Sequence, residues 1–365
     1  MIRKYSFRKI SILAIALALA ALFGLQPVST KALGGTPTCR QVSPVPVTLS
    51  PTDPTTYYVA GQLCAQGSLH GKSMQLLVHG LTYDHQYWDW PRSPQYSYVR
   101  AATNTGYATL AIDRIGDGAS SHPVDGTQVT TVSGGYVLHQ IIQKLRAGAI
   151  GGTAFPKVMT VSHSFGAASA GYEAGTYHDV DGVIISGFMH DISPTTLGAF
   201  AASVYPAHLD PKFANSGLND TYLTTQPGAR AQFFFNTATT DPGVIATDEQ
   251  IKQTGTVGEL DPTTFDQANA ATAQITVPVL IAMGDSDAIF CDTAASLSCT
   301  DSNAILARER SHFGARACLE AYVLRSSGHD INLHRNAHDW YAAAANWSDR
   351  HVGHDAGHPG EQRCR

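Results

Sequence analysis

Short apolar runs alternate along the chain with longer stretches in which apolar residues recur at helical spacing. The runs predict buried strands at residues 45–49, 57–64, 74–78, 107–112, 158–161, 183–186, 277–283 and 319–324. The longer stretches predict helices at residues 96–103, 129–147, 166–173, 302–309 and 337–347. This alternation predicts an α/β fold in which helices cover both faces of a mostly parallel sheet.

The alternation stops between residues 187 and 275, where Thr, Ala and Asp are frequent. No apolar run of the strand type occurs there, and helical pieces are expected at 195–204 and 248–255. We interpret this region as a helical cap inserted into the core, without a sheet of its own. The chain then divides into a leader, two parts of one core, the cap and a tail, at residues 1–32, 33–187, 276–350, 188–275 and 351–365.

The first 32 residues have the features of a secretion signal. Four basic residues precede an apolar core of about 15 residues, which is short of the about 20 that a membrane-spanning helix needs. Thr30-Lys31-Ala32 fits a cleavage site. The alternative is an uncleaved membrane anchor. We expect a secreted protein, since no later segment is long and apolar enough to span a membrane.

Charge and cysteine content agree with a secreted protein. Removing the leader takes the net charge from −5 to about −10, so the basic footprint of a nucleic-acid-binding protein is absent. Six cysteines, none spaced C-x-x-C, favour three disulfides over a zinc or redox site. Of the 15 pairings that six cysteines allow, near neighbours in the sequence favour Cys39–Cys64, Cys291–Cys299 and Cys318–Cys364.

The strand at 158–161 runs directly into Ser-His-Ser-Phe-Gly at 162–166, and small, helix-tolerant residues follow. A sharp strand–turn–helix with a serine at its apex needs small residues two positions before and after that serine. Ser162 and Gly166 meet this need around Ser164, although Gly is usual at the position of Ser162. Similar strings occur by chance in Ser- and Gly-rich chains. Ser164 is therefore a candidate nucleophile that needs support from elsewhere in the chain.

A serine nucleophile requires a base, a carboxylate that orients the base, and donors for the oxyanion. In α/β proteins such groups lie on loops at the carboxyl ends of strands. His-Gly-Leu at 79–81 follows a buried strand, and we expect the backbone N–H groups of Leu81 and Phe165 to form the oxyanion hole. The alternative is that Gly80 only relieves a tight turn.

The last two predicted strands offer the acid and the base. The first of them ends in Gly-Asp-Ser-Asp, and the spacing from the glycine favours Asp287 over Asp285. The second is followed, through a Gly-containing turn, by His329. There are 16 histidines, so one alone indicates little, and His334 and His338 are nearby competitors. We expect His329 to be the base and Asp287 its partner.

Two aromatic groups are candidates for the substrate pocket. Tyr83, Tyr87, Trp88 and Trp90 follow the oxyanion turn, and either line an acyl pocket or pack the loop. From this group we take Tyr83 and Trp88 as candidate substrate-binding residues. The Phe run at 233–235 either faces the substrate or forms the core of the cap.

The C-terminal sequence His-x-x-His-Asp-x-x-His at 351–358 has spacings that suit metal ligands on one helical face. Flanking Gly and Pro residues argue instead for a loose tail. We therefore expect no metal site there, and no cofactor elsewhere in the chain.

The chain order Ser164, Asp287, His329 is the order expected of α/β-hydrolases. At these residues the chain resembles that superfamily, and it looks most like its secreted, single-cap esterases. The resemblance covers about residues 57–350 and rests on His79-Gly80, the loop at 113–121 with Gly116 and Gly118, Ser162-x-Ser164-x-Gly166, Gly284-x-x-Asp287 and Gly328-His329. It implies an eight-stranded, mostly parallel sheet with the cap after the sixth strand. Dehalogenases and epoxide hydrolases of the superfamily use Asp at the elbow, and Ser164 argues against both.

The resulting hypothesis is a secreted serine hydrolase that cleaves a small-molecule carboxylic ester through Ser164, His329 and Asp287. We expect a monomer that needs no nucleic-acid partner. A lipase, lactonase, peptidase or acyltransferase would use the same residues, and so would a Ser-dependent lyase acting on cyanohydrins. A non-catalytic binding protein with the same fold is the alternative from a different class.

Overall fold

The computed structural model describes residues 35–360 of the 365-residue chain. The expected secretion signal at 1–32 and Cys364, one half of the third expected disulfide, lie outside the described residues.

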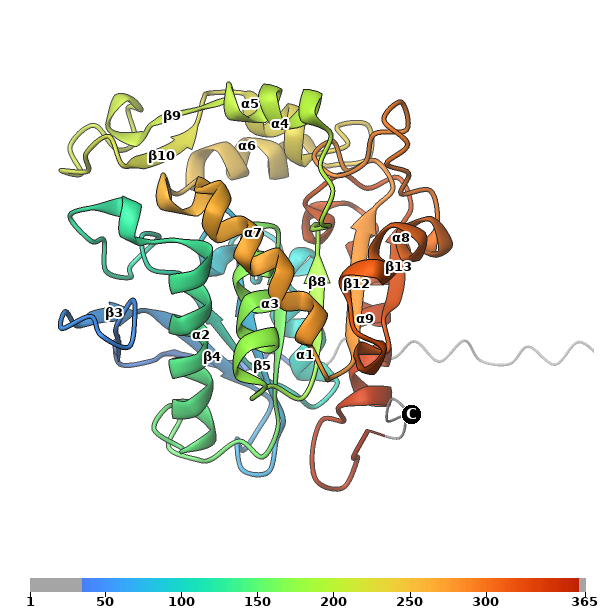
Figure 1. The fold of residues 1–365 in the computed structure, drawn as a ribbon. Coiled ribbons are helices and arrows are strands. Elements are labelled where there is room, and N and C mark those ends of the chain that lie inside the picture. Colours follow the sequence, from blue (N-terminus) through green and yellow to red (C-terminus); the bar gives the residue numbers. More distant parts are fainter. Residues whose placement is uncertain (1–34, 361–365) are drawn as a thin grey trace, which may run out of the picture. The chain divides into compact units, whose positions relative to one another are not determined.

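The centre of the molecule is an eight-stranded sheet in the order β1-β4-β6-β5-β7-β8-β12-β13 (Figure 1). Its strands are β1 (Thr38–Gln41), β4 (Gly61–Ala65), β5 (Met74–Val78), β6 (Ala108–Ile112), β7 (Val158–His163), β8 (Val183–Ser186), β12 (Val279–Gly284) and β13 (Glu320–Leu324). The β1–β4 and β4–β6 pairs are antiparallel, and the other pairs are parallel. β5, β6, β7, β8 and β12 are buried along their whole length, as helix-covered parallel strands require. The predicted α/β fold and its mostly parallel sheet are confirmed.

Helices cover the two faces of this sheet. In Figure 1, α2 (Thr131–Arg146), α3 (Phe165–Tyr177) and α7 (Pro262–Ala271) lie side by side across one face. On the other face α1 (Tyr98–Asn104) packs against α9 (Ala337–His351). α8 (Ser302–Glu309) contacts β13, and the residues that follow α8 contact Thr272 just after α7. α2 begins at a capping box, in which Thr130 and Ser133 each satisfy a backbone N–H of the other.

The N-terminal segment contains a strand that sequence patterning did not predict. All four residues of β1 are exposed, so it has no apolar alternation to detect. Its pairing with β4 sets Cys39 opposite Cys64, and a disulfide joins them. The predicted strands at 45–49 and 57–64 begin with β2 (Val45–Val47) and β3 (Tyr57–Val59), which form a separate antiparallel pair.

The insertion after β8, the sixth strand of the central sheet, lies above the carboxyl ends of the core strands in Figure 1. It contains α4 (Pro194–Ala201), α5 (Ala229–Phe234) and α6 (Pro242–Ile251). It also has a three-stranded antiparallel sheet of β9 (Val204–Pro206), β10 (Tyr222–Thr225) and β11 (Gly255–Thr256). The expectation that the cap has no sheet of its own is therefore wrong. Strands this short leave no apolar run in the sequence.

Two of the three expected disulfides, Cys39–Cys64 and Cys291–Cys299, are present. Disulfides persist in oxidising compartments, so both fit an extracellular protein. Among the described residues, no helix has the length and apolar character needed to cross a membrane.

Candidate active site

The turn between β7 and α3 carries Ser164 in a strained conformation. Its φ of 52° and ψ of −128° are uncommon for a residue with a side chain. A Cβ at Gly166 would lie 2.2 Å from the backbone oxygen of His79, so only glycine lets α3 start this close to β5. Ser162 is buried, and its hydroxyl donates to the Ile184 carbonyl in β8 over 2.9 Å. The space on both sides of Ser164 is therefore filled by neighbouring strands, which explains why Ser162 and Gly166 are small.

The structure brings the three expected triad residues together in one hydrogen-bonded series. His329 Nε2 lies 2.9 Å from Ser164 Oγ, and His329 Nδ1 lies 2.8 Å from Asp287 Oδ2. The second oxygen of Asp287 accepts the backbone N–H groups of Ile289 and Phe290, at 2.8 and 3.1 Å. All three side chains are buried. This arrangement orients the imidazole with one nitrogen toward the carboxylate and the other toward the serine.

The electrostatics of the series favour an ion pair between acid and base. Burial acts to raise the pKa of Asp287, but the nearby His329 and the two backbone N–H donors bring it below its ordinary value. Burial acts to lower the pKa of His329, but the charge and hydrogen bond of Asp287 bring it above its ordinary value of 6.5. The pair is therefore built to stabilise a protonated His329, the form that follows proton transfer from Ser164.

The competing residues have other partners. Asp285 is half-buried, and its carboxylate bonds within the turn that follows β12. His334 Nε2 accepts the N–H groups of Gly328 and Asn236, at 2.9 and 3.0 Å. It therefore organises the loop that carries the base. His338 is exposed.

Residues 80–82, named the oxyanion loop because they are expected to supply an oxyanion donor, follow β5 and lie against the elbow. A Cβ at Gly80 would be 2.9 Å from Ser164 Cβ, so a larger residue would push the loop away from the nucleophile. Phe165 is the first residue of α3, where N–H groups lack an intrahelical acceptor and the helix dipole favours negative charge. Leu81 and Phe165 line the same cavity as Ser164.

His79 fixes the orientation of the oxyanion loop. Its Nε2 accepts the backbone N–H of Arg114 over 3.0 Å, so the proton of the neutral ring is on Nδ1. Nδ1 then donates to the Gly80 carbonyl over 2.9 Å. Burial, and after it the charge of Arg114, keep the pKa of His79 well below its ordinary value, which maintains the neutral form. Because a peptide unit is planar, fixing the Gly80 oxygen on one side directs the Leu81 N–H to the other.

Ser164 and His329 open onto a cavity of about 490 Å³, a size typical of small-molecule sites. Most of its lining is apolar. Six phenylalanines contribute, namely Phe165, Phe188, Phe200, Phe234, Phe265 and Phe290. Asp191 and Asp266, both exposed, are the acidic residues at its solvent side. The cavity lies between core and cap, because α4 and the segment 259–269 form part of its wall.

Comparison with protein families shows to which family the chain belongs. Residues 75–344 match the model of the alpha/beta hydrolase family. The chain belongs to this family.

Solved structures agree on the fold. An esterase from Thermogutta terrifontis is 17% identical, with a TM-score of 0.54 over 84% of this chain and 97% of that one. A monoglyceride lipase from Saccharomyces cerevisiae is 15% identical, with a TM-score of 0.55 over 86% and 96%. A bromoperoxidase from Bacillus anthracis is 17% identical, with a TM-score of 0.55 over 84% and 98%. At such identities the likeness shows the fold alone. Comparison with the sequences of curated proteins gives no match.

The two candidate substrate-binding residues of this alpha/beta hydrolase lie in different places. Tyr83 lines the cavity. Trp88 is not among the lining residues, and its buried ring packs edge-on against Tyr87 and Tyr98. The choice of Trp88 is therefore not supported, because closeness in sequence to the oxyanion loop does not set the direction of a side chain. Within the Phe run, Phe234 alone lines the cavity.

A second buried His–Asp pair lies beside the first in this hydrolase and was not predicted. His163 Nε2 is 3.0 Å from Asp330 Oδ1, and the hydroxyl of Tyr83 donates to the other oxygen of Asp330. The rings of His163 and His329 are 4.7 Å apart. Burial, and then the charge of His329, hold the pKa of His163 well below its ordinary value. The only signal in the sequence was adjacency, since His163 precedes Ser164 and Asp330 follows His329.

The C-terminal histidines do not form a loose tail. His354, Asp355 and His358 place ligand-type atoms within 4.8 Å of one another, and the two rings stack at 4.3 Å. The backbone oxygen of His354 accepts the N–H of Ser73, which ties this segment to the core. Both imidazoles are hydrogen-bonded to aspartates, at 3.0 Å each.

Proposed function

We propose that this alpha/beta hydrolase cleaves carboxylic esters through an acyl-enzyme intermediate on Ser164. One observation carries the proposal. Ser164, His329 and Asp287 form a hydrogen-bonded series whose serine end opens onto an apolar cavity of about 490 Å³, and Leu81 and Phe165 line the same cavity. A nucleophile, a base, an orienting carboxylate and oxyanion donors are the components that acyl transfer requires.

In the first half of the reaction, His329 Nε2 accepts the proton of Ser164 while Oγ attacks the ester carbonyl carbon. The carbonyl oxygen becomes an oxyanion and accepts hydrogen bonds from the N–H groups of Leu81 and Phe165. Protonated His329 then gives its proton to the departing alkoxide, and the alcohol leaves. Asp287 stabilises the imidazolium throughout and is not itself protonated.

In the second half, a water molecule replaces the alcohol. His329 accepts a proton from the water, whose oxygen attacks the acyl carbon of the acyl-enzyme. The oxyanion forms at the same donors and collapses, Ser164 recovers its proton from His329, and the carboxylic acid leaves.

The lining of the cavity supports an uncharged, apolar acyl group. Of the described residues that line it, none is Lys or Arg, and Asp191 and Asp266 lie at its solvent side. We expect p-nitrophenyl butyrate to be cleaved with a kcat/KM on the order of tenfold above that of mono-p-nitrophenyl succinate, because like charges repel the added carboxylate. An equal or reversed preference would contradict an apolar acyl site.

Labelling and activity of the Ser164→Ala variant test the proposal. We expect a fluorophosphonate probe to label the wild-type protein and not this variant. Hydrolysis of p-nitrophenyl butyrate should fall by a factor on the order of 10⁴ or more. Full activity in Ser164→Ala would refute the assignment of the nucleophile. A wild-type protein that is folded, inactive on an ester panel and unlabelled would favour the binding-protein alternative.

We also propose that the protein is exported and that its leader is removed near residue 32. Two disulfides in the core support export, because they form in oxidising compartments. Determination of the N-terminal residue of the protein recovered outside the producing cells tests this point. A mature N-terminus near residue 33 is the expected result.

A further inference from the structure

The oxyanion loop contains an unfavourable backbone conformation. Thr82 has a φ of 63°, a left-handed conformation that β-branched residues rarely adopt. Such a conformation persists only where the surroundings impose it. The residue directly before it is Leu81, which lines the same cavity as Ser164 and whose N–H is the proposed oxyanion donor. Whatever holds Thr82 therefore also sets the position of an oxyanion donor.

The surroundings that hold Thr82 come from the cap. Its N–H donates to the carbonyl of Thr254 over 3.1 Å, and its carbonyl accepts the N–H of Gln253 over 2.9 Å. The next residue, Gly255, packs so closely on Leu81 that a Cβ there would lie 2.2 Å from Leu81 Cδ1. The cap segment 253–255 thus binds the oxyanion loop through its backbone.

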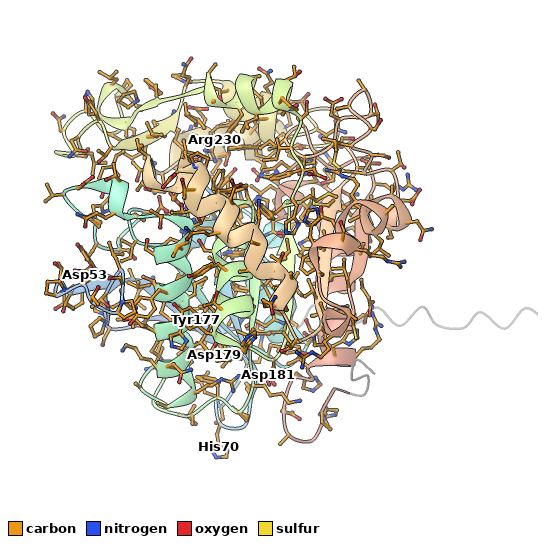
Figure 2. All side chains as sticks on the ribbon, viewed as in Figure 1. Asp53, His70, Tyr177, Asp179, Asp181 and Arg230 are labelled. Atoms are coloured by element: carbon orange, nitrogen blue, oxygen red, sulfur yellow. A yellow bond between two sulfur atoms is a disulfide. The ribbon has the colours of Figure 1, made fainter. Side chains whose placement is uncertain are left out.

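Arg230 of α5 adds a side-chain contact to the same residue. Its Nη1 donates to Thr82 Oγ1 over 2.7 Å and lies 3.4 Å from the Thr82 carbonyl. Its Nε and Nη2 bind the two oxygens of Asp248 on α6, at 2.5 and 2.9 Å. The guanidinium also lies 4.4 Å from the ring centre of Tyr83. Arg230 is only 1% exposed, and Figure 2 labels it high in the cap, far from Asp179 near the end of α3.

The cap also acts on Gly80, at the other end of the loop, through the pair that its residue Glu259 forms with the core residue Arg114. Arg114 donates from Nη2 to the carbonyl of Gly80 over 3.3 Å, and its Nη1 pairs with the cap residue Glu259. The cap therefore supports the residues on both sides of Leu81, Gly80 through Arg114 and Thr82 through Arg230.

We infer that Arg230 is a positioning residue that holds the oxyanion loop through Thr82. On this view the cap does more than form a wall of the cavity. Its folded arrangement, centred on the Arg230–Asp248 pair, is required for the Leu81 N–H to meet the oxyanion. The inference rests on the proposed ester hydrolysis, because the oxyanion hole belongs to that mechanism.

Two variants test the role without leaving a buried charge unpaired. Thr82→Val keeps the shape of the side chain and the Arg230–Asp248 pair, and removes only the hydroxyl that Arg230 binds. The double variant Arg230→Met/Asp248→Leu removes both charges together, which buried pairs tolerate better than loss of one partner. Arg335→Met is a control at an exposed core–cap ion pair, because Arg335 also joins the core to the cap, through Asp241, and within the described part of the chain has no hydrogen bond to residues 80–82.

The measurements are kcat and KM on p-nitrophenyl butyrate, the Ki of butaneboronic acid, and the thermal midpoint. A boronic acid forms a tetrahedral adduct with a serine and so reports on the oxyanion hole. We expect kcat to fall about 3- to 10-fold in Thr82→Val and about 10- to 100-fold in the double variant, below the 10²–10³-fold typical of losing a donor. KM should change less than about twofold, and the boronic acid Ki should rise in parallel with the loss of kcat. Arg335→Met should keep wild-type kcat and Ki.

Three outcomes would overturn the inference. Unchanged kcat and Ki in Thr82→Val would show that Arg230 does not act through the hydroxyl. A raised KM with unchanged kcat would assign Arg230 to the pocket wall. An equal loss of kcat in Arg335→Met would point to general loosening of the cap. If the double variant does not fold, Thr82→Val alone decides. Failure of the ester mechanism itself is recognised separately, by wild-type protein that resists fluorophosphonate labelling.

Discussion

The two buried His–Asp pairs, His329–Asp287 and His163–Asp330, are alike in composition and differ in surroundings. Both histidines are almost fully buried, and the pairs have N···O distances of 2.8 and 3.0 Å. Only His329 reaches Ser164 with its second nitrogen. The second nitrogen of His163 lies 3.2 Å from the hydroxyl of Ser186, inside the sheet. The partner of the second ring nitrogen therefore distinguishes the candidate base, His329, from His163, which links buried segments.

The carboxylates of the two pairs, Asp287 and Asp330, differ in their hydrogen-bond partners and in the direction of their pKa shifts. Asp287 accepts two backbone N–H groups, and the net effect of burial and its partners is a lowered pKa. The pKa of Asp330 is raised, because burial outweighs the favourable effects of His329, Tyr83 and Arg230. An ionised Asp287 is suited to stabilise an imidazolium. Asp330 lacks backbone donors and is less suited to this task.

The second pair occurs where it does because it is the sequence neighbour of the first. His163 precedes Ser164 and Asp330 follows His329, so the second pair joins the elbow to the loop after β13, as the His329–Ser164 hydrogen bond does. The neighbours of Ser164 and His329 therefore meet beside the triad, where the rings of His163 and His329 are 4.7 Å apart. On the proposed mechanism, the first pair performs the chemistry, whereas the second pair holds together the two segments that carry Ser164 and His329.

Replacing each histidine by glutamine gives the largest contrast. His329→Gln should lower kcat on p-nitrophenyl butyrate by a factor on the order of 10⁴, because the base is lost. His163→Gln should lower kcat by no more than about tenfold and reduce the free energy of unfolding by about 1–3 kcal/mol, since Asp330 loses a buried partner. Steady-state kinetics and urea unfolding measure both quantities. Similar losses of kcat in the two variants would abolish the distinction between the pairs.

The aspartates should differ by a similar factor. Asp287→Asn is expected to lower kcat on the order of 10⁴-fold, because an amide favours the wrong tautomer of His329 and cannot stabilise its charged form. Asp330→Asn should retain activity within about tenfold, with a lowered thermal midpoint. Both variants replace one carboxylate oxygen by an NH2 group, and both aspartates are fully buried. Each variant is therefore the matched control of the other. A greater loss in Asp330→Asn would move the catalytic role to the second pair.

Much of this arrangement could be predicted from the sequence, because the triad residues follow buried strands and such positions converge at one edge of a parallel sheet. The second pair could not, since adjacency in sequence does not say which neighbours meet in space. β1 escaped detection because its four residues are exposed. The cap sheet escaped because its strands are very short. Trp88 was grouped with Tyr83 only because the two are close in sequence. In the fold, Tyr83 lines the cavity and Trp88 packs against Tyr87 and Tyr98.

The pH dependence of kcat/KM sharpens the comparison through the position of a midpoint, which does not depend on the size of the rate. His329 must be neutral to accept a proton, and its pKa lies above 6.5 because Asp287 outweighs burial. kcat/KM should therefore rise with pH and reach half its limit above pH 6.5. In Asp287→Asn this midpoint should move to lower pH, because the main cause of the raised pKa is gone. Asp330→Asn should move it less, since Asp330 makes no hydrogen bond to His329. If the midpoint did not move in Asp287→Asn, the rise of kcat/KM with pH would not report the titration of His329.

The smallest expected effect concerns Ser162, which stands where the elbow usually has glycine. Its hydroxyl donates to Ile184 in β8, and its carbonyl accepts the hydroxyl of Ser186 that also contacts His163. Ser162 therefore belongs with the second pair and has no contact with the reacting atoms. Ser162→Gly should keep kcat and KM within about twofold and reduce the free energy of unfolding by about 1 kcal/mol, for one hydrogen bond. Kinetics together with urea unfolding test this. A large fall in kcat at unchanged stability would give the Ser162 hydroxyl a role in the chemistry, and the boundary between the catalytic pair and the structural pair would then have to be drawn elsewhere.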